Sequence, residues 1–177
     1  MGLLLLSGFQ VRAGEPYFCT FGNRTLYYER YKAGSEKLIQ TTTLDFGAAV
    51  KAIIQNVFPK ARISYSGDVA LMPANMDVGD ILPDSHCAVK VSAFTYYIDV
   101  TERVVLRKEQ LTTPAGTFDC VVVREHKVEE GPMHHGDFWS DTWYAPGIGY
   151  VRHDTFDKKM RLESMEILIE DRRYPTQ

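Results

Sequence analysis

The sequence has few of the residues that cross-link or anchor a small protein. It contains three cysteines in 177 residues, and none of them forms a C-x-x-C pair. An odd number of cysteines at irregular spacing predicts neither a disulfide framework nor a zinc finger. There is no run of five or more lysines and arginines, and the formal net charge is −3. Because nucleic-acid binding needs a clustered basic surface, we expect no nucleic-acid partner.

Long hydrophobic runs are also missing. The most apolar stretch lies in residues 1–13 and has about eight apolar residues, against about 20 for a transmembrane helix, so no transmembrane segment is predicted. This stretch resembles the back half of a secretory signal peptide, with Val11 and Ala13 at the small-residue positions before a cleavage site. No basic residue precedes it, which indicates that the native start lies further upstream. The alternative interpretation is an N-terminal β-strand. On the signal-peptide reading the protein is periplasmic or otherwise exported, and residues 14–177 form a single β-rich domain.

Motifs for nucleophilic or phosphate chemistry are absent as well. The chain contains neither a G-x-S-x-G elbow nor a glycine-rich phosphate loop, and we expect no cofactor. Cys120 alternates with Phe118 and Val122, so we interpret it as a small buried apolar residue. Cys19 and Cys87 would pair only in an oxidising compartment, and the sequence does not decide whether they do. Nucleophilic catalysis therefore has little support.

What the chain does have is a succession of short segments in which apolar and polar residues alternate. They predict strands over 25–31, 37–44, 61–65, 69–72, 87–106, 117–128, 138–144, 150–156 and 160–169. Residues 87–106 are long enough for two strands, although no Gly or Pro marks a turn there, and we place Val104 and Leu106 on the apolar face and Arg103 on the polar face. The apolar phase of the last segment changes near Glu163, which predicts a β-bulge.

One segment has the spacing of a helix. Asp45 offers an N-cap, Pro59 ends the run, and the apolar residues between them recur at helical spacing: Ala49, Val50, Ile53, Ile54, Val57 and Phe58. A helix with one apolar face must pack on a sheet. The prediction is a mainly β fold, in which an antiparallel meander curls around one helix.

Two proline turns bracket the central hairpin. Pro114 and Pro146 each lie where a β-turn needs φ near −65°, and Gly147 occupies the position of a type II turn that needs a positive φ. The loop at residues 131–136 is predicted to join the two strands between these turns.

Three motifs resemble those of a known family: Asp77-Val78-Gly79-Asp80-Ile81-Leu82-Pro83, Thr112 to Cys120, and Trp143 to Arg152. They are similar to the motifs of TapB-like proteins, uncharacterised envelope proteins found mainly in Bacteroidetes. The resemblance covers roughly residues 17–169. It implies a curved antiparallel sheet that forms an open half-barrel with a helix on its concave side, as in the lipoprotein carriers LolA and LolB and the enzyme VioE. It supplies no catalytic residues, because the shared motifs are turns and corners.

Two sets of residues are candidates for a site. His134, His135 and His153 are zinc-ligand types, but adjacent histidines of a strand point to opposite sides, so a solvated loop is the favoured reading and no metal is expected. The aromatic residues of the central hairpin and the helix face either form core or bound a groove for an apolar ligand, a lipid or a hydrophobic peptide. These groove candidates are Ile53, Ile54, Val57, Phe58, Trp143, Tyr144 and Tyr150. Asp141, Arg152 and Asp154 are expected to form cross-strand charge pairs.

Three functions fit these observations. The first is a non-enzymatic envelope binding or carrier-like module that holds an apolar ligand. The second is a structural or interaction module whose edge strands pair with a partner. The third is an enzyme by analogy with VioE, or a metal-dependent one. The sequence leaves the oligomeric state open.

Overall fold

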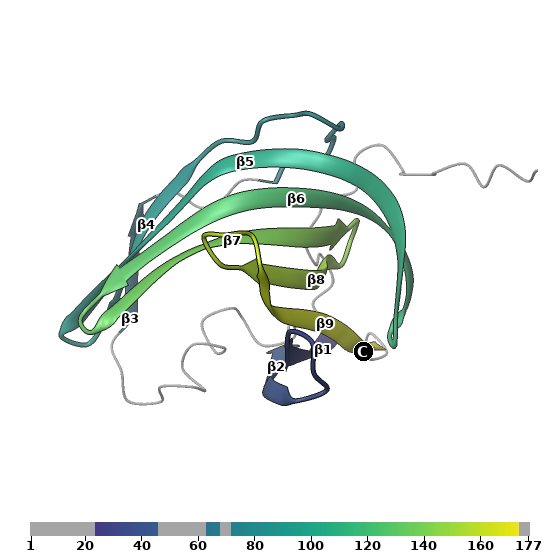
Figure 1. The fold of residues 1–177 in the computed structure, drawn as a ribbon, viewed down its shortest axis with the longest axis horizontal. Coiled ribbons are helices and arrows are strands. Elements are labelled where there is room, and N and C mark those ends of the chain that lie inside the picture. Colours follow the sequence, from purple (N-terminus) through teal and green to yellow (C-terminus); the bar gives the residue numbers. More distant parts are fainter. Residues whose placement is uncertain (1–23, 46–62, 68–71, 174–177) are drawn as a thin grey trace, which may run out of the picture.

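The computed structural model describes residues 24–45, 63–67 and 72–173, which form one antiparallel sheet of nine strands (Figure 1). The strands are β1 (Arg24–Lys32), β2 (Leu38–Asp45), β3 (Ile63–Gly67), β4 (Ser85–Val91), β5 (Phe94–Thr113), β6 (Gly116–Gly131), β7 (His134–Ala145), β8 (Gly149–Phe156) and β9 (Leu162–Arg173). Their order across the sheet is β2-β1-β9-β8-β7-β6-β5-β4-β3. Strands β3 to β9 therefore form a meander, and the β1–β2 hairpin adds to it beside β9.

The mainly β, antiparallel prediction is confirmed for the described part of the chain. The sheet is open, with β2 and β3 at its edges, and the long strands β5 and β6 arch over the shorter ones (Figure 1). The predicted helix after Asp45 and the segment 1–13 lie outside the described residues, and Asp45 itself ends β2. The residues that the structure describes contain no helix, and so none able to cross a membrane.

The long segment 87–106 divides into two strands. Val91 pairs with Phe94, so β4 and β5 are joined by Ser92 and Ala93 alone. Ser92 has φ +57°. A positive φ at the first position of a two-residue loop is the pattern of a type II′ turn, where glycine is usual. The turn therefore has no glycine or proline to mark it in the sequence.

A bulge in β5 changes which residues of that strand face inward, contrary to the prediction. The pairing with β6 shifts between Thr101 and Val104, and Glu102 has φ +52°. As a result Arg103 and Val105 are each 1% exposed. Val104 and Leu106, predicted to be the buried pair, are only partly buried. Placing Arg103 on a solvated face was wrong, because a bulge changes which residues face inward.

The bulge predicted in the last strand is confirmed. Thr155 pairs with Ser164 and Phe156 with Leu162, so Glu163 is the extra residue of β9. The loop predicted at residues 131–136 is shorter than expected. Only Pro132 and Met133 join β6 to β7, and His134 and His135 already belong to β7.

Strand β6 is buried on both faces near its middle. Cys120, Val121, Val122 and Val123 are all 0% exposed. Cys120 and Val122 belong to a cluster that also contains Leu26, Tyr28, Trp143, Ala145, Ile148, Val151 and Leu168. Val121 and Val123 belong to a second cluster with Val105, Met76 and Leu82. The interpretation of Cys120 as a buried apolar residue is confirmed, and burial raises the pKa of its thiol to about 12.

The connection over residues 72–84 covers the second cluster. It has no regular structure apart from one bridge between Ile81 and Val104. Backbone hydrogen bonds hold it to β5: the Gly79 N–H donates to the Val105 carbonyl at 2.8 Å, and the Val105 N–H donates to the Asp80 carbonyl at 2.9 Å. The connection thereby shields one face of β5 and β6.

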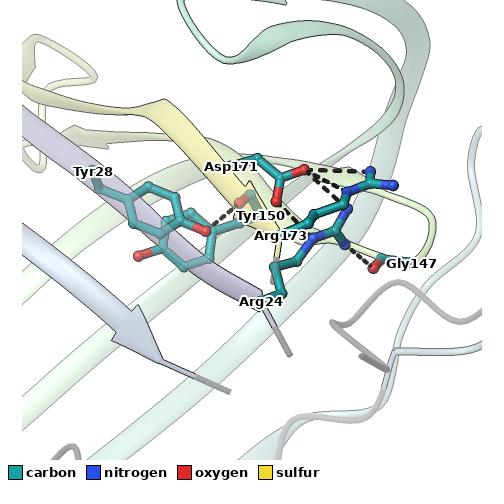
Figure 2. A network of polar contacts seen from close by, with 6 residues as sticks. All are labelled: Arg24, Tyr28, Gly147, Tyr150, Asp171 and Arg173. Atoms are coloured by element: carbon teal, nitrogen blue, oxygen red, sulfur yellow. Dashed lines mark hydrogen bonds and ion pairs between the residues drawn. The ribbon is translucent and has the colours of Figure 1, made fainter. Parts of the chain in front are cut away.

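A buried polar corner fastens β1 to the turn between β7 and β8 (Figure 2). The Arg24 guanidinium is 2% exposed, contacts both Asp171 oxygens at 2.7 and 2.9 Å, and donates to the Gly147 carbonyl at 2.8 Å. The Tyr28 hydroxyl donates to the Tyr150 carbonyl at 2.9 Å, and the two rings stack with centroids 4.5 Å apart. Since the β1–β2 hairpin is remote in sequence, these contacts fix where it lies.

The Pro146-Gly147 turn has the predicted geometry and supplies a test. Gly147 has φ +71°, and the Ile148 N–H donates to the Ala145 carbonyl at 3.2 Å.

We expect Gly147→Ala to lower the free energy of unfolding by about 1 kcal/mol, because a Cβ atom is strained at this φ. Gly147→Asn is the control, since asparagine tolerates a left-handed conformation, and it should cost less. Urea unfolding followed by tryptophan fluorescence measures both, and an equal loss in the two variants would contradict the argument.

Candidate functional site

Strand register divides the side chains of the central strands into two faces. Thr142 pairs with His153 and Tyr144 with Tyr150, so these residues share one face, here called the tyrosine face. Trp143 pairs with Val122 and Arg152 on the opposite face, here called the tryptophan face. Two cavities lined by described residues open on the tyrosine face.

The first is a polar cavity of about 260 Å³ built from five strands. Its charged lining residues are Arg30 of β1, Glu125 and Lys127 of β6, and Glu166 of β9. Its uncharged lining residues are Thr142 and Tyr144 of β7 and Tyr150 and His153 of β8. Thr142, His153, Glu166 and Arg30 occupy one row across neighbouring strands, since each pairs with the next. The row brings residues more than a hundred positions apart to one place.

The acidic side chains of this polar cavity have partners. Glu125 is 5% exposed and accepts a hydrogen bond from Arg103 Nε at 3.3 Å, with Lys127 Nζ at 3.7 Å. The same Arg103 guanidinium donates to the Pro83 carbonyl at 2.8 Å. Glu166 accepts a hydrogen bond from the Thr42 hydroxyl at 3.0 Å. Both carboxylates are thus already engaged with the protein.

Arg30 differs from these residues because its Nε atom is buried with no hydrogen-bond partner. The other two such atoms among the described residues are the hydroxyl oxygens of Ser140 and Thr155. Ser140 pairs with Glu125 and with Thr155, so all three atoms belong to the tyrosine face. An unpaired buried polar group costs free energy. Of these three residues only Arg30 lines the polar cavity, so among the described residues this cavity contains one buried donor without a partner.

Burial moves the pKa values of three residues of the polar cavity away from neutral pH. Burial, reinforced by the charges of Lys127 and Arg30, lowers the pKa of His153 to about 3. Its Nδ1 lies 2.8 Å from the Thr142 hydroxyl. Burial also raises the pKa values of Tyr144 and Tyr150 far above 10. General acid–base catalysis works best with pKa values near the working pH, and none of these three groups has one.

The second cavity is apolar and has a volume of about 350 Å³. It is lined by Val89 of β4, Tyr96 and Ile98 of β5, Glu129 of β6 and His134 of β7. Glu129 follows Lys127 by two residues in an unbroken register, so this apolar cavity lies on the same face as the polar one. His134 Nε2 and Glu129 form an ion pair at 3.0 Å at its rim.

A glycine makes room for one wall of the apolar cavity. A Cβ atom on Gly131 would lie 2.3 Å from Cδ1 of Tyr96. The Tyr96 ring therefore lies flat against the β6 backbone at this position. Any larger residue at 131 would push the ring into the cavity.

The tryptophan face carries a ladder of ion pairs. Trp143 lies between the guanidinium groups of Arg107 and Arg152, 5.3 and 4.6 Å from its ring centroid, and its Nε1 donates to Glu109 at 2.5 Å. Arg124 contacts Asp141 through two bonds of 2.7 and 2.8 Å.

The cross-strand pairing expected among Asp141, Arg152 and Asp154 was wrong, because each of the two aspartates pairs with a different arginine. Arg124 pairs with Asp141 across β6 and β7, whereas Arg152 binds Asp154 within β8 at 2.7 and 2.8 Å. Asp141 and Asp154 lie directly opposite each other in the sheet. Each buried carboxylate therefore has its own arginine.

The structure separates the predicted site residues. Tyr144 and Tyr150 line the polar cavity, whereas Trp143 is on the other face and 5% exposed. Ile53, Ile54, Val57 and Phe58 lie outside the described residues. His134 and His153 line different cavities, and His135 faces Glu130 at 3.8 Å. Among the described residues no group of three or more His, Cys, Asp or Glu side chains could hold a metal.

Sequence reasoning missed the charged residues of the polar cavity. The face of β6 that begins with Val121 and Val123 continues with Glu125 and Lys127. In the sequence, charged residues that follow apolar ones on the same face of a predicted strand would have indicated a buried polar site here. Arg30 had no such signal, because its position in the cavity depends on the pairing of β1 with β9.

Comparison with known proteins relates the chain to one family and one fold. Residues 40–168 match the model of the DUF3108-like family, a range that contains all three motifs noted in the sequence. The comparison with curated proteins gave no match.

Two crystal structures are similar to this chain. A Bacteroides fragilis protein described as exported, with a YmcC-like fold, has a TM-score of 0.68 and 18% identity, over 90% of this chain and 100% of that one. A Parabacteroides distasonis protein described as a lipoprotein has a TM-score of 0.63 and 16% identity, over 89% and 99%. At these identities the likeness concerns the fold alone.

The buried ion pair beneath the polar cavity gives a stability prediction. Arg103→Met should lower the free energy of unfolding by about 3–5 kcal/mol, because it leaves the buried Glu125 carboxylate without its arginine. Arg103→Met combined with Glu125→Leu should recover much of that loss, since no buried charge is then left unpaired. Urea unfolding of both variants measures the difference. Equal losses in the single and double variants would show that Arg103 matters for packing rather than for charge.

The depressed pKa of His153 gives a pH prediction. In the unfolded chain this imidazole takes up a proton near pH 6.5, whereas in the folded protein it stays neutral down to about pH 3. Stability is therefore full above pH 6.5 and falls as the pH drops below it, by about 1–2 kcal/mol at pH 5. His153→Gln should reduce this dependence, measured by urea unfolding at pH 7 and pH 5. An unchanged difference between the two pH values would assign it to other groups.

Proposed function

This chain belongs to the DUF3108-like family, and on that premise we propose that it is a non-enzymatic binding or carrier-like protein of the cell envelope that holds an apolar ligand. The observation that carries the proposal is the apolar cavity between β4, β5, β6 and β7. Its three apolar residues, Val89, Tyr96 and Ile98, come from the two strands at one side of the open sheet. Ligand cavities are typically apolar, with few polar groups at defined positions, and this one has Glu129 and His134 at its rim.

The surroundings of this cavity fit a hydrophobic ligand. Phe94 is 52% exposed and Met133 is fully exposed, and they belong to the β4–β5 and β6–β7 hairpins that border the cavity. Exposed apolar residues that gather near a cavity are typical of an entrance for an apolar ligand.

Export is part of the same proposal. It is supported by the signal-peptide-like stretch at residues 1–13 and by the words exported protein and lipoprotein in the descriptions of the two structural relatives. The finer assignment to the TapB-like proteins, with the carrier-like half-barrel that they share with LolA and LolB, belongs to this proposal too. Its support is the order of the three turn motifs along the chain.

A second candidate, an interaction module, is favoured by one observation. Strand β2 lies at an edge of the sheet, and Leu38 and Ile39 are 45% and 53% exposed. No residue from Leu38 to Leu44 carries a charge. Such an edge can pair with a strand of another protein. A protein that carries no ligand and forms complexes through β2 would favour this candidate.

The proposal predicts that filling the apolar cavity abolishes ligand binding. Native mass spectrometry of protein from its own cell envelope should show a bound apolar molecule that is lost on denaturation. Ile98→Arg should remove it, because a guanidinium would have to enter an apolar cavity. Ile81→Arg is the matched control, since Ile81 is 84% exposed and outside the cavity lining.

A milder variant guards against unfolding. Gly131→Ala should also weaken binding, because it displaces the Tyr96 ring. Unfolding curves measured alongside separate lost binding from lost structure. A folded Ile98→Arg protein that keeps its ligand, or wild-type protein with a clean ligand-free mass, would contradict the proposal.

A further inference from the structure

The two cavities lie one after the other along a single face of β6. Glu125 and Lys127 line the polar cavity, and Glu129, the next residue on that face, lines the apolar one. Lys127 pairs directly with Val100 of β5 and Phe138 of β7, which lie between the cavities. Its ammonium group lies 5.7 Å from the centroid of the Phe138 ring. A positive charge thus stands where the apolar cavity meets the polar one.

The lining of the polar cavity carries two positive and two negative side chains, and Arg103 beneath it adds a third positive group. Arg30, Lys127 and Arg103 are positive, Glu125 and Glu166 are negative, and His153 is neutral at physiological pH. Arg103 and Glu125 neutralise each other in a buried pair, and Lys127 approaches Glu125 only to 3.7 Å. The Nε atom of Arg30 forms no hydrogen bond with Glu166, although the two residues are neighbours across β1 and β9. One guanidinium is therefore left to bind an added anion.

A buried hydrogen-bond donor without a partner also favours binding of an anion in the polar cavity. The buried Nε of Arg30 has no partner, and neither do the hydroxyls of Ser140 and Thr155, which lie on the same face outside the cavity lining. A guanidinium and hydroxyl groups are the donors that bind a carboxylate or a phosphate. The phenol groups of Tyr144 and Tyr150, kept protonated by burial, add two more potential donors to the lining.

We propose that the polar cavity binds the anionic group of a single-chain amphiphile, a carboxylate or a phosphate, whose hydrocarbon chain occupies the apolar cavity. The inference rests on the proposed function, and it adds the class of the ligand. Arg30 binds the anionic group directly. Lys127 contacts it from the boundary between the cavities, and the apolar residues Val89, Tyr96 and Ile98 contact the chain.

The test compares ligands that share a chain and differ in the head group. Dodecanoate, dodecyl phosphate and the uncharged 1-dodecanol are titrated into the full chain by isothermal titration calorimetry. Wild-type protein should bind both anions more tightly than the alcohol. Arg30→Met, which keeps the aliphatic stem, should weaken binding of the anions by about tenfold or more and leave that of the alcohol unchanged. Arg161→Met, an exposed position in the β8–β9 turn, is the matched control.

The outcomes separate the inference from the proposed function. Equal weakening of anions and alcohol by Arg30→Met, or wild-type protein that prefers the alcohol, would overturn the head-group site and leave an apolar binding protein. Binding of none of the three probes would overturn both. If Arg30→Met fails to fold, Lys127→Met provides the same comparison from the boundary of the cavities. A tighter dodecyl phosphate than dodecanoate would identify phosphate as the preferred head group.

Discussion

The structure depends on one constraint, the burial of β6 from both sides. Four consecutive residues, Cys120 to Val123, have no exposed surface. Side chains of a strand alternate between the faces of a sheet, so a strand can be buried in this way only if each face is covered. One face packs against residues of β1, β7, β8 and β9, and the other lies beneath the connection over residues 72–84. An apolar side chain contributes roughly 1.5–3 kcal/mol when it is fully buried, so this short stretch contributes strongly to holding both layers in place.

The division into two faces explains why the candidate site lies where it does. On the tryptophan face, arginines and carboxylates are matched in short ion pairs around Trp143, and the charges are satisfied within the sheet. On the tyrosine face the apolar run of β6 gives way to Glu125 and Lys127, and polar atoms are left without partners. Natural proteins rarely bury unpaired polar groups without a reason. The difference between the faces is a physical basis for looking for a ligand on one of them.

Fold similarity alone does not assign a function to this chain. The two structural relatives share the open sheet at less than a fifth identical residues, and function depends on sites rather than on folds. The proposed site depends on the positions of Arg30, Lys127 and Ile98 on this particular sheet. An amphiphile fits these positions because an apolar cavity and a polar one follow each other along the same strand.

The sequence by itself determined the local structure. Proline and glycine specify the turn at Pro146 and Gly147 through their allowed backbone angles, and alternation specifies nearly every strand, including the bulge at Glu163. Which residues point inward was decided by tertiary structure, because the bulge at Glu102 buries Arg103 in place of Val104. The polar cavity was decided in the same way. Arg30 reaches His153 and Glu166 only because β1 pairs with β9 after more than a hundred intervening residues, and no local pattern encodes that pairing.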